Sequence, residues 1–190
     1  MIYEKIPVET YCPAVHAAIP QSAAELVSYA RPASGCLAER DGRWGVIVVP
    51  GGGYRMLAPS ESEPVALAFL SRGCQTFVLR YSLIPAKYPA QLLELAGAVA
   101  HLRQHREAYG LSHIAVCGLS AGGHLTGCLC NLWADPMLSG TLQAEAELFR
   151  PRRVAGIRPR RALDGAGGRV AGRRGAGIQQ TFAGLRSSLP

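Results

Sequence analysis

The chain has 190 residues, of which 48% are hydrophobic, so it is long enough to form one globular domain with its own core. No stretch approaches the roughly 18 uninterrupted apolar residues that a membrane-spanning helix needs. The first residues also lack the basic and then apolar pattern of a signal peptide. These observations argue against a membrane protein and predict a cytoplasmic location.

The net charge of +7 is distributed very unevenly along the chain. Residues 150–190 contain ten arginines and one acid, Asp164, whereas residues 1–149 contain ten basic and twelve acidic residues. Arg, Gly, Ala and Pro make up 27 of the last 41 residues, a composition that buries too little apolar surface to offset the entropy of ordering. We therefore expect a folded domain over residues 1–149 and an Arg/Gly-rich, disordered tail over residues 150–190.

Secondary-structure signals become clear after about residue 43. The first 40 residues are hard to interpret beyond a candidate strand at 24–30. Apolar runs then predict strands at 45–49, 76–79 and 114–117, separated by helices that we place after the capping box Ser60-x-x-Glu63, at 90–108 and at 120–133. This alternation predicts an α/β fold with a mostly parallel sheet and helices on both faces. Ligands of such sheets bind at the carboxyl ends of the strands.

The sequence Gly118-Leu119-Ser120-Ala121-Gly122 follows the strand at 114–117 directly. A strand that ends in G-x-S-x-G and continues into a helix is typical of a nucleophile elbow, which holds a serine hydroxyl above the sheet. Ser120 is therefore a candidate nucleophile for an ester carbonyl. The backbone N–H of Ala121 and those of Gly52 and Gly53, which follow an earlier strand, are candidate donors to the oxyanion.

The two glycine motifs also have interpretations other than an esterase site. Both glycine motifs also fit tight turns in a non-catalytic α/β protein. Neither a phosphate-binding P-loop nor a dinucleotide-binding glycine pattern is present, so we expect no cofactor. The six cysteines are scattered, and His124 one turn before Cys128-x-Cys130 is a weak metal pattern, so we also expect no metal.

Five segments carry a resemblance to a known family: VVPGGGY at 48–54, EPVA at 63–66, FVLRYS at 77–82, YPAQ at 88–91 and IAVCGLSAGGHL at 114–125. Through them, residues 43–133 resemble the acetyl-esterase or acetyl-xylan-esterase-like branch of the α/β-hydrolases. This branch is related to the hormone-sensitive-lipase group and to feruloyl-esterase-like domains. The resemblance implies an α/β-hydrolase fold, truncated at its C-terminal end.

The resemblance also implies the chemistry of the chain. It implies an acyl-serine intermediate at Ser120 and an oxyanion hole formed by the Ala121 N–H and the loop 51–53. The loop 81–88 would then wall the acyl pocket. The implied partner is a small-molecule ester, such as an acetylated sugar, and the sequence gives no signal for an oligomeric state.

The acid and the base of a catalytic triad are not identifiable. In α/β-hydrolases they follow the serine in the order acid and then histidine, but the only histidine after Ser120 is His124, one turn along the same predicted helix. Asp135 follows the serine too closely, and Asp164 lies in the tail. We therefore expect an impaired enzyme.

The tail itself has two interpretations. The first is a frameshift near codon 151, which would make the arginine-rich residues out-of-frame translation. The second is a genuine basic arm that binds a polyanion, attached to a non-catalytic α/β protein. Because the tail has one aromatic residue, Phe182, and no RGG repeat, we expect no nucleic-acid partner.

Overall fold

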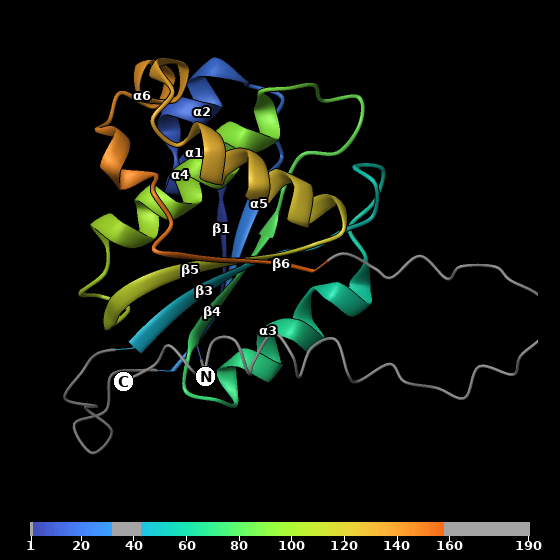
Figure 1. Cartoon of the computed structure of the whole chain (residues 1–190), viewed down its shortest axis with the longest axis vertical. Helices are drawn as coiled ribbons and strands as arrows, with labels where there is room; N and C mark the ends of the chain where they lie inside the picture. The colour runs from blue at the N-terminus through green and yellow to red at the C-terminus, as the bar shows by residue number, and fades with distance from the viewer. Residues whose placement is uncertain (1, 32–42, 158–190) are drawn as a thin grey trace, which may run out of the picture.

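The computed structural model describes residues 2–31 and 43–157, which form a sheet of six strands with helices on both faces (Figure 1). The strand order is β1-β2-β4-β3-β5-β6. The strands are β1 (Ile2–Pro7), β2 (Glu25–Ala30), β3 (Arg43–Val49), β4 (Gln75–Arg80), β5 (Leu111–Leu119) and β6 (Arg153–Ile157). The pairs β3–β4, β3–β5 and β5–β6 are parallel, whereas β1–β2 and β2–β4 are antiparallel. The mostly parallel sheet that the sequence predicts is thus confirmed.

The helices divide unequally between the two faces of the sheet (Figure 1). They are α1 (Val8–Tyr11), α2 (Pro13–Ala18), α3 (Glu63–Leu70), α4 (Ala90–Gln104), α5 (Ala121–Leu132) and α6 (Pro136–Leu142), with short 3₁₀ turns η2 (Pro59–Glu61) and η3 (Ala146–Leu148). Helix α3 covers one face, and α1, α2, α4, α5 and α6 lie over the other. The first two helices and β1 fall in the N-terminal region whose sequence shows no clear period.

Strand β3 shows why its apolar run is continuous. Successive side chains of a strand point to opposite faces. Val46 and Val48 belong to the cluster beneath α3, while Ile47 and Val49 belong to the larger cluster beneath α4 and α5. All four are buried, so both faces of the central strand need apolar side chains.

The predicted start of α3 is wrong. Ser60 lies in the 3₁₀ turn η2, and α3 begins at Glu63 with Ser62 at its N-cap position. The Ser62 hydroxyl donates to the Ala58 carbonyl oxygen at 3.0 Å, so no side chain caps the helix. The motif lies in the right region of the chain, but Ser60 belongs to the 3₁₀ turn before α3 and therefore does not cap the helix.

The sheet continues beyond the predicted domain boundary at residue 149. Strand β6 pairs in parallel with the second half of β5, from Ala115↔Arg153 to Leu119↔Ile157. The folded domain therefore extends into the arginine-rich region. Residues 158–190, which hold Asp164 and Phe182, lie outside the described residues. Within the described ranges, no helix is long and apolar enough to cross a membrane.

Candidate functional site

The turn between β5 and α5 has the sharp geometry that the G-x-S-x-G motif predicts. Ser120 occupies the N-cap position of α5 with φ 50° and ψ −114°. A positive φ is costly for a residue with a side chain, and it persists where the surrounding structure enforces it. Here the buried strand β5 and the helix α5 fix the two ends of the turn, so the Ser120 side chain is held at the carboxyl end of the sheet.

The two glycines of the motif allow the close approach of backbone that this turn requires. A Cβ atom at Gly118 would lie 2.3 Å from the Gly122 carbonyl oxygen and 2.3 Å from Thr126 Oγ1. A Cβ atom at Gly122 would lie 1.9 Å from the Val49 carbonyl oxygen. Any side chain at either position would push α5 away from the ends of β3 and β5.

The structure brings the second glycine motif next to the first. A Cβ atom at Gly51 would lie 2.8 Å from the Ser120 Cβ atom, so the loop after β3 passes directly beside the serine. Gly52, Gly53 and Tyr54 follow with φ values of 127°, 65° and 62°. Three consecutive positive φ values explain why the loop is rich in glycine.

Two side chains far along the sequence hold this loop. The Gly51 N–H donates to Glu61 Oε2 at 2.8 Å, and the buried Tyr81 hydroxyl donates to the Pro50 carbonyl oxygen at 2.8 Å. Burial, with smaller contributions from Tyr54 and Glu61, raises the pKa of Tyr81 and keeps its hydroxyl protonated as a donor. Sequence reasoning missed both residues because neither is close to Gly51 along the chain.

Three backbone amides beside Ser120 remain unpaired. Within the described part of the chain, the N–H groups of Gly52, Gly53 and Ala121 have no hydrogen-bond acceptor, whereas that of Gly51 is used by Glu61. Ala121 also begins α5, where the helix dipole is positive. The three amides predicted as oxyanion donors are therefore free to bind an external acceptor.

A cavity of about 310 Å³ with mainly apolar walls lies against the first turns of α5, and Ser120 is not among its lining residues. Ile84, Ala86 and Tyr88 contribute from the loop after β4. The remaining lining residues are Tyr54, Gln91, Leu92, His124, Leu125 and Cys128. The cavity thus joins the glycine loop, the β4–α4 loop and the first turns of α5.

The ring nitrogens of His124 contact residues other than Ser120. Its Nδ1 lies 2.9 Å from the Tyr54 hydroxyl, and its Nε2 lies 3.8 Å from Cys128 Sγ. Burial, followed by the nearby Cys128, raises the pKa of Tyr54 to about 12, so this hydroxyl also stays protonated at neutral pH. The His124 side chain therefore lies along α5, as the sequence predicts, and forms no hydrogen bond with Ser120.

The other four histidines also have local roles, and all five lie within the described residues. His101 and His105 stack on α4 with ring centroids 4.2 Å apart, and burial, aided by His105, lowers the pKa of His101 to about 4. His113 packs against Trp44, and His16 lies on α2. No histidine hydrogen-bonds to Ser120.

Among the acids, Asp135 caps α6 by accepting a hydrogen bond from the Met137 N–H at 2.8 Å. Across residues 2–31 and 43–157, no three His, Cys, Asp or Glu side chains are grouped to hold a metal ion.

Glu94 is a buried acid that sequence reasoning did not single out. Its Oε1 accepts hydrogen bonds from the hydroxyls of Ser22 at 2.6 Å and Ser82 at 2.5 Å, and its Oε2 accepts from the Ser82 N–H at 2.8 Å. Burial raises its pKa, and these hydrogen bonds oppose the rise. Glu94 thereby anchors the start of the loop that walls the cavity. A single acid in an otherwise apolar stretch of α4 is the signal that marks it.

Solved structures similar to this chain share the α/β-hydrolase fold. MGS-M1, an α/β hydrolase from a Medee basin deep-sea metagenome, matches 90% of this chain with a TM-score of 0.64 and 27% identity. The acetyl ester-xyloside bifunctional hydrolase of Caldicellulosiruptor lactoaceticus matches 80% with a TM-score of 0.61 and 29% identity. The chain spans 64% and 56% of these two proteins.

The curated relative and the family comparison agree with this fold. Endo-1,4-beta-xylanase B of Butyrivibrio fibrisolvens is 34% identical over 90 residues, which is 44% of this chain and 14% of that protein. The model of the BD-FAE family matches residues 39–148, more than half of the chain. The lineage is therefore that of carboxylic ester hydrolases with the α/β-hydrolase fold, and the chain belongs to the BD-FAE family.

Proposed function

We propose that the chain is a serine-esterase-type hydrolase of small acyl esters and that Ser120 is its nucleophile. The observation that carries this proposal is the position of Ser120, in a strained turn directly beside the glycine loop and at the start of the helix that forms one wall of an apolar cavity. A nucleophile, oxyanion donors and an acyl pocket are the parts that acyl transfer to serine requires.

In the proposed reaction, Ser120 Oγ attacks the ester carbonyl and its proton passes to a base. The carbonyl oxygen becomes an oxyanion, which accepts hydrogen bonds from the N–H groups of Gly52, Gly53 and Ala121. The tetrahedral intermediate collapses, the alcohol leaves with a proton, and water hydrolyses the acyl-serine. The cavity walled by the loop 81–88 holds the acyl group.

None of the five histidines hydrogen-bonds to Ser120, so no histidine is in place to take the Ser120 proton. We therefore expect weak activity: losing a triad member leaves only about 10³–10⁴-fold catalysis over water in known systems. The chain spans 64% and 56% of the lengths of the two solved proteins named above.

An acetyl ester on a carbohydrate is the substrate class that we propose. One similar structure is named as an acetyl ester-xyloside hydrolase, and the curated relative is named as a xylanase.

A fluorophosphonate probe tests the nucleophile directly, because it forms a covalent bond with an activated serine. We expect slow labelling of the full chain that disappears in Ser120→Ala and persists in Ser62→Ala, a serine of the α3 N-cap. No labelling of Ser120 after prolonged exposure would refute the assignment. Rapid labelling together with multiple turnovers of p-nitrophenyl acetate would instead refute the proposed impairment.

The second candidate is a non-catalytic α/β protein whose basic tail binds polyanions. The ten arginines of residues 150–190 favour it. Under this alternative, removing residues 158–190 abolishes RNA binding at low salt and Ser120 is inert to the probe. Absence of RNA binding by the full chain excludes it.

A further inference from the structure

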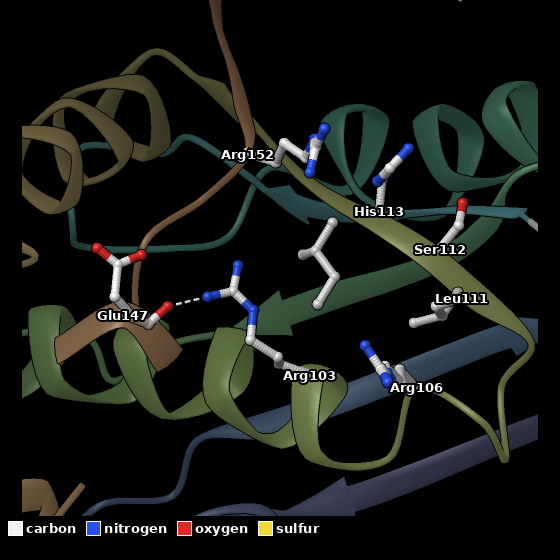
Figure 2. A pocket seen from close by; sticks show the side chains of 8 residues that line it. Arg103, Arg106, Leu111, Ser112, His113, Glu147 and Arg152 are labelled. Atoms are coloured by element: carbon white, nitrogen blue, oxygen red, sulfur yellow. Dashed lines mark hydrogen bonds between the residues drawn. The ribbon is translucent and has the colours of Figure 1, made fainter. Parts of the chain in front are cut away.

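A second cavity of about 310 Å³ lies at the other end of β5, away from Ser120 (Figure 2). Arg103 reaches it from the last turn of α4, Arg106 from the turn after that helix, and Arg152 from the segment before β6. His113, near the start of β5, also borders it. Strand β6 pairs with β5 only from Ala115 onward. The cavity therefore occupies the notch beside the part of β5 that precedes this pairing.

Three guanidinium groups and one carboxylate line this notch. The carboxylate belongs to Glu147, and its Oε1 already lies 3.4 Å from Nη1 of Arg150. The side chains of Arg106 and Arg152 are exposed and have no acceptor among the described residues. Like charges that share a site repel one another unless an anion lies among them, so the notch has an uncompensated positive charge.

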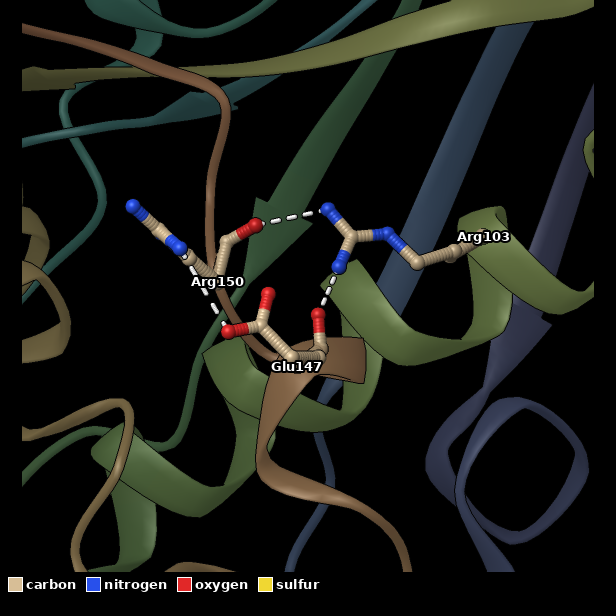
Figure 3. A network of polar contacts seen from close by, with 3 residues as sticks. All are labelled: Arg103, Glu147 and Arg150. Carbon is tan, nitrogen blue, oxygen red and sulfur yellow. Dashed lines mark hydrogen bonds and ion pairs between the residues drawn. The ribbon is translucent and has the colours of Figure 1, made fainter.

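Arg103 is the fixed member of the group (Figure 3). Its guanidinium donates to the carbonyl oxygen of Glu147 and, at 2.6 Å, to that of Arg150. Burial lowers the pKa of Arg103, Glu147 raises it and Arg150 lowers it further, but an arginine remains charged. Because a guanidinium has five N–H donors and these contacts use two, the side chain keeps donors for a ligand.

His113 also borders the cavity, but its ring lies on the other face of the sheet from Arg103 and Arg106. Its ring packs against Trp44 with centroids 4.8 Å apart, and its Nδ1 is buried without a hydrogen-bond partner in the described chain. A nitrogen without exposed surface cannot contact a ligand in the cavity, so the arginines are the groups that could bind one.

We propose that this arginine notch, formed by Arg103, Arg106 and Arg152, binds a small dianionic phosphoryl group. A dianion balances the excess of guanidinium over carboxylate better than a monovalent carboxylate does. The planar guanidinium donors also match phosphate oxygens in pairs. The volume accommodates inorganic phosphate or a small phosphate monoester. The proposal is independent of Ser120, which lies at the opposite end of the strand.

Calorimetric titration of the full chain at low salt tests the notch with inorganic phosphate, a sugar phosphate and acetate. We expect both phosphates to bind in the millimolar range or tighter and acetate to bind at least tenfold more weakly. A preference for the sugar phosphate would identify a monoester as the ligand, and equal affinity would identify the phosphate group alone.

Two exposed arginines offer a variant that should fold normally. Arg106→Gln/Arg152→Gln should weaken phosphate binding at least tenfold without changing the thermal midpoint in the absence of phosphate. Lys5→Gln, which removes an exposed charge from β1, should leave binding unchanged. Phosphate affinity that is equal in the double variant and the wild type would overturn the proposal. So would binding of RNA without binding of either phosphate.

Discussion

Gly118 on β5 and Gly156 on β6 face each other in the sheet register, but their surroundings are opposite. A Cβ atom at Gly118 would collide with backbone and side-chain atoms of α5, whereas one at Gly156 would meet nothing within 4 Å. The elbow is therefore closed tightly around its backbone, while β6 is attached to the sheet chiefly by its ladder of backbone hydrogen bonds. Close packing restricts which residues fit at position 118, whereas backbone pairing places little restriction on the side chain at position 156.

The largest expected effect comes from forcing a side chain into the elbow. Gly122→Ala places a methyl group 1.9 Å from the Val49 carbonyl oxygen, which is backbone and cannot rotate away. We expect the free energy of unfolding to fall by about 3 kcal/mol or more. Urea denaturation of the purified variant measures this change.

Gly127→Ala is the matched control for that experiment, because Gly127 lies on the same helix with open space around it. Replacing a helical glycine by alanine should stabilise the protein by about 0.5–1 kcal/mol. Equal effects of the two substitutions would contradict the tight packing of the elbow.

A smaller effect is expected from the hydroxyl that holds the glycine loop. Tyr81→Phe leaves the Pro50 carbonyl oxygen without its buried donor and should destabilise the fold by about 1–3 kcal/mol. Tyr54→Phe is the control, since its hydroxyl bond to His124 is exposed and should contribute under about 0.5 kcal/mol. Fluorophosphonate labelling should also slow in Tyr81→Phe. A Tyr81→Phe variant as stable as the wild type would show that the loop does not depend on this bond.

The same contrast explains how far the sequence predicts the structure. The sequence predicts the turn at Ser120 because only glycine fits at positions 118 and 122. It predicts β3 because both faces of that strand are buried and therefore apolar. Strand β6 escapes prediction because Val154 and Gly156 are exposed, so its residues carry no apolar period.

The candidate site also contains residues that the sequence predicts and residues that it does not. Ser120 and the candidate donor amides follow from two local motifs, at 118–122 and 51–53, since the residues that shape each turn are neighbours along the chain. Glu61, Tyr81 and Glu94 do not, because they reach the site through hydrogen bonds that join distant segments.

The loop that walls the cavity depends on a buried charge, so its stability should vary with pH. The unfolded Glu94 carboxyl has an ordinary pKa near 4.5, and burial raises the pKa in the folded state. The folded protein then binds more protons between these two values, so raising the pH through this window lowers the free energy of unfolding. Glu94→Gln removes this dependence.

Unfolding curves of the wild type and of Glu94→Gln, collected from pH 4 to pH 8, measure the difference between the two proteins. The variant should gain stability relative to the wild type as the pH rises above about 4.5, and the difference should level off above the folded pKa. A difference that shrinks with rising pH would mean that the hydrogen bonds from Ser22 and Ser82 outweigh burial.

The smallest expected effect on the free energy of unfolding comes from a substitution in β6, at the glycine that faces Gly118. Gly156→Ala adds a methyl group in open space, so the free energy of unfolding should change by no more than about 0.5 kcal/mol. Gly118→Ala, directly across the ladder, should cost several times more because the new Cβ meets Gly122 and Thr126 of α5. A loss above about 2 kcal/mol in Gly156→Ala would show that side-chain packing, and not only backbone pairing, holds β6 to the sheet.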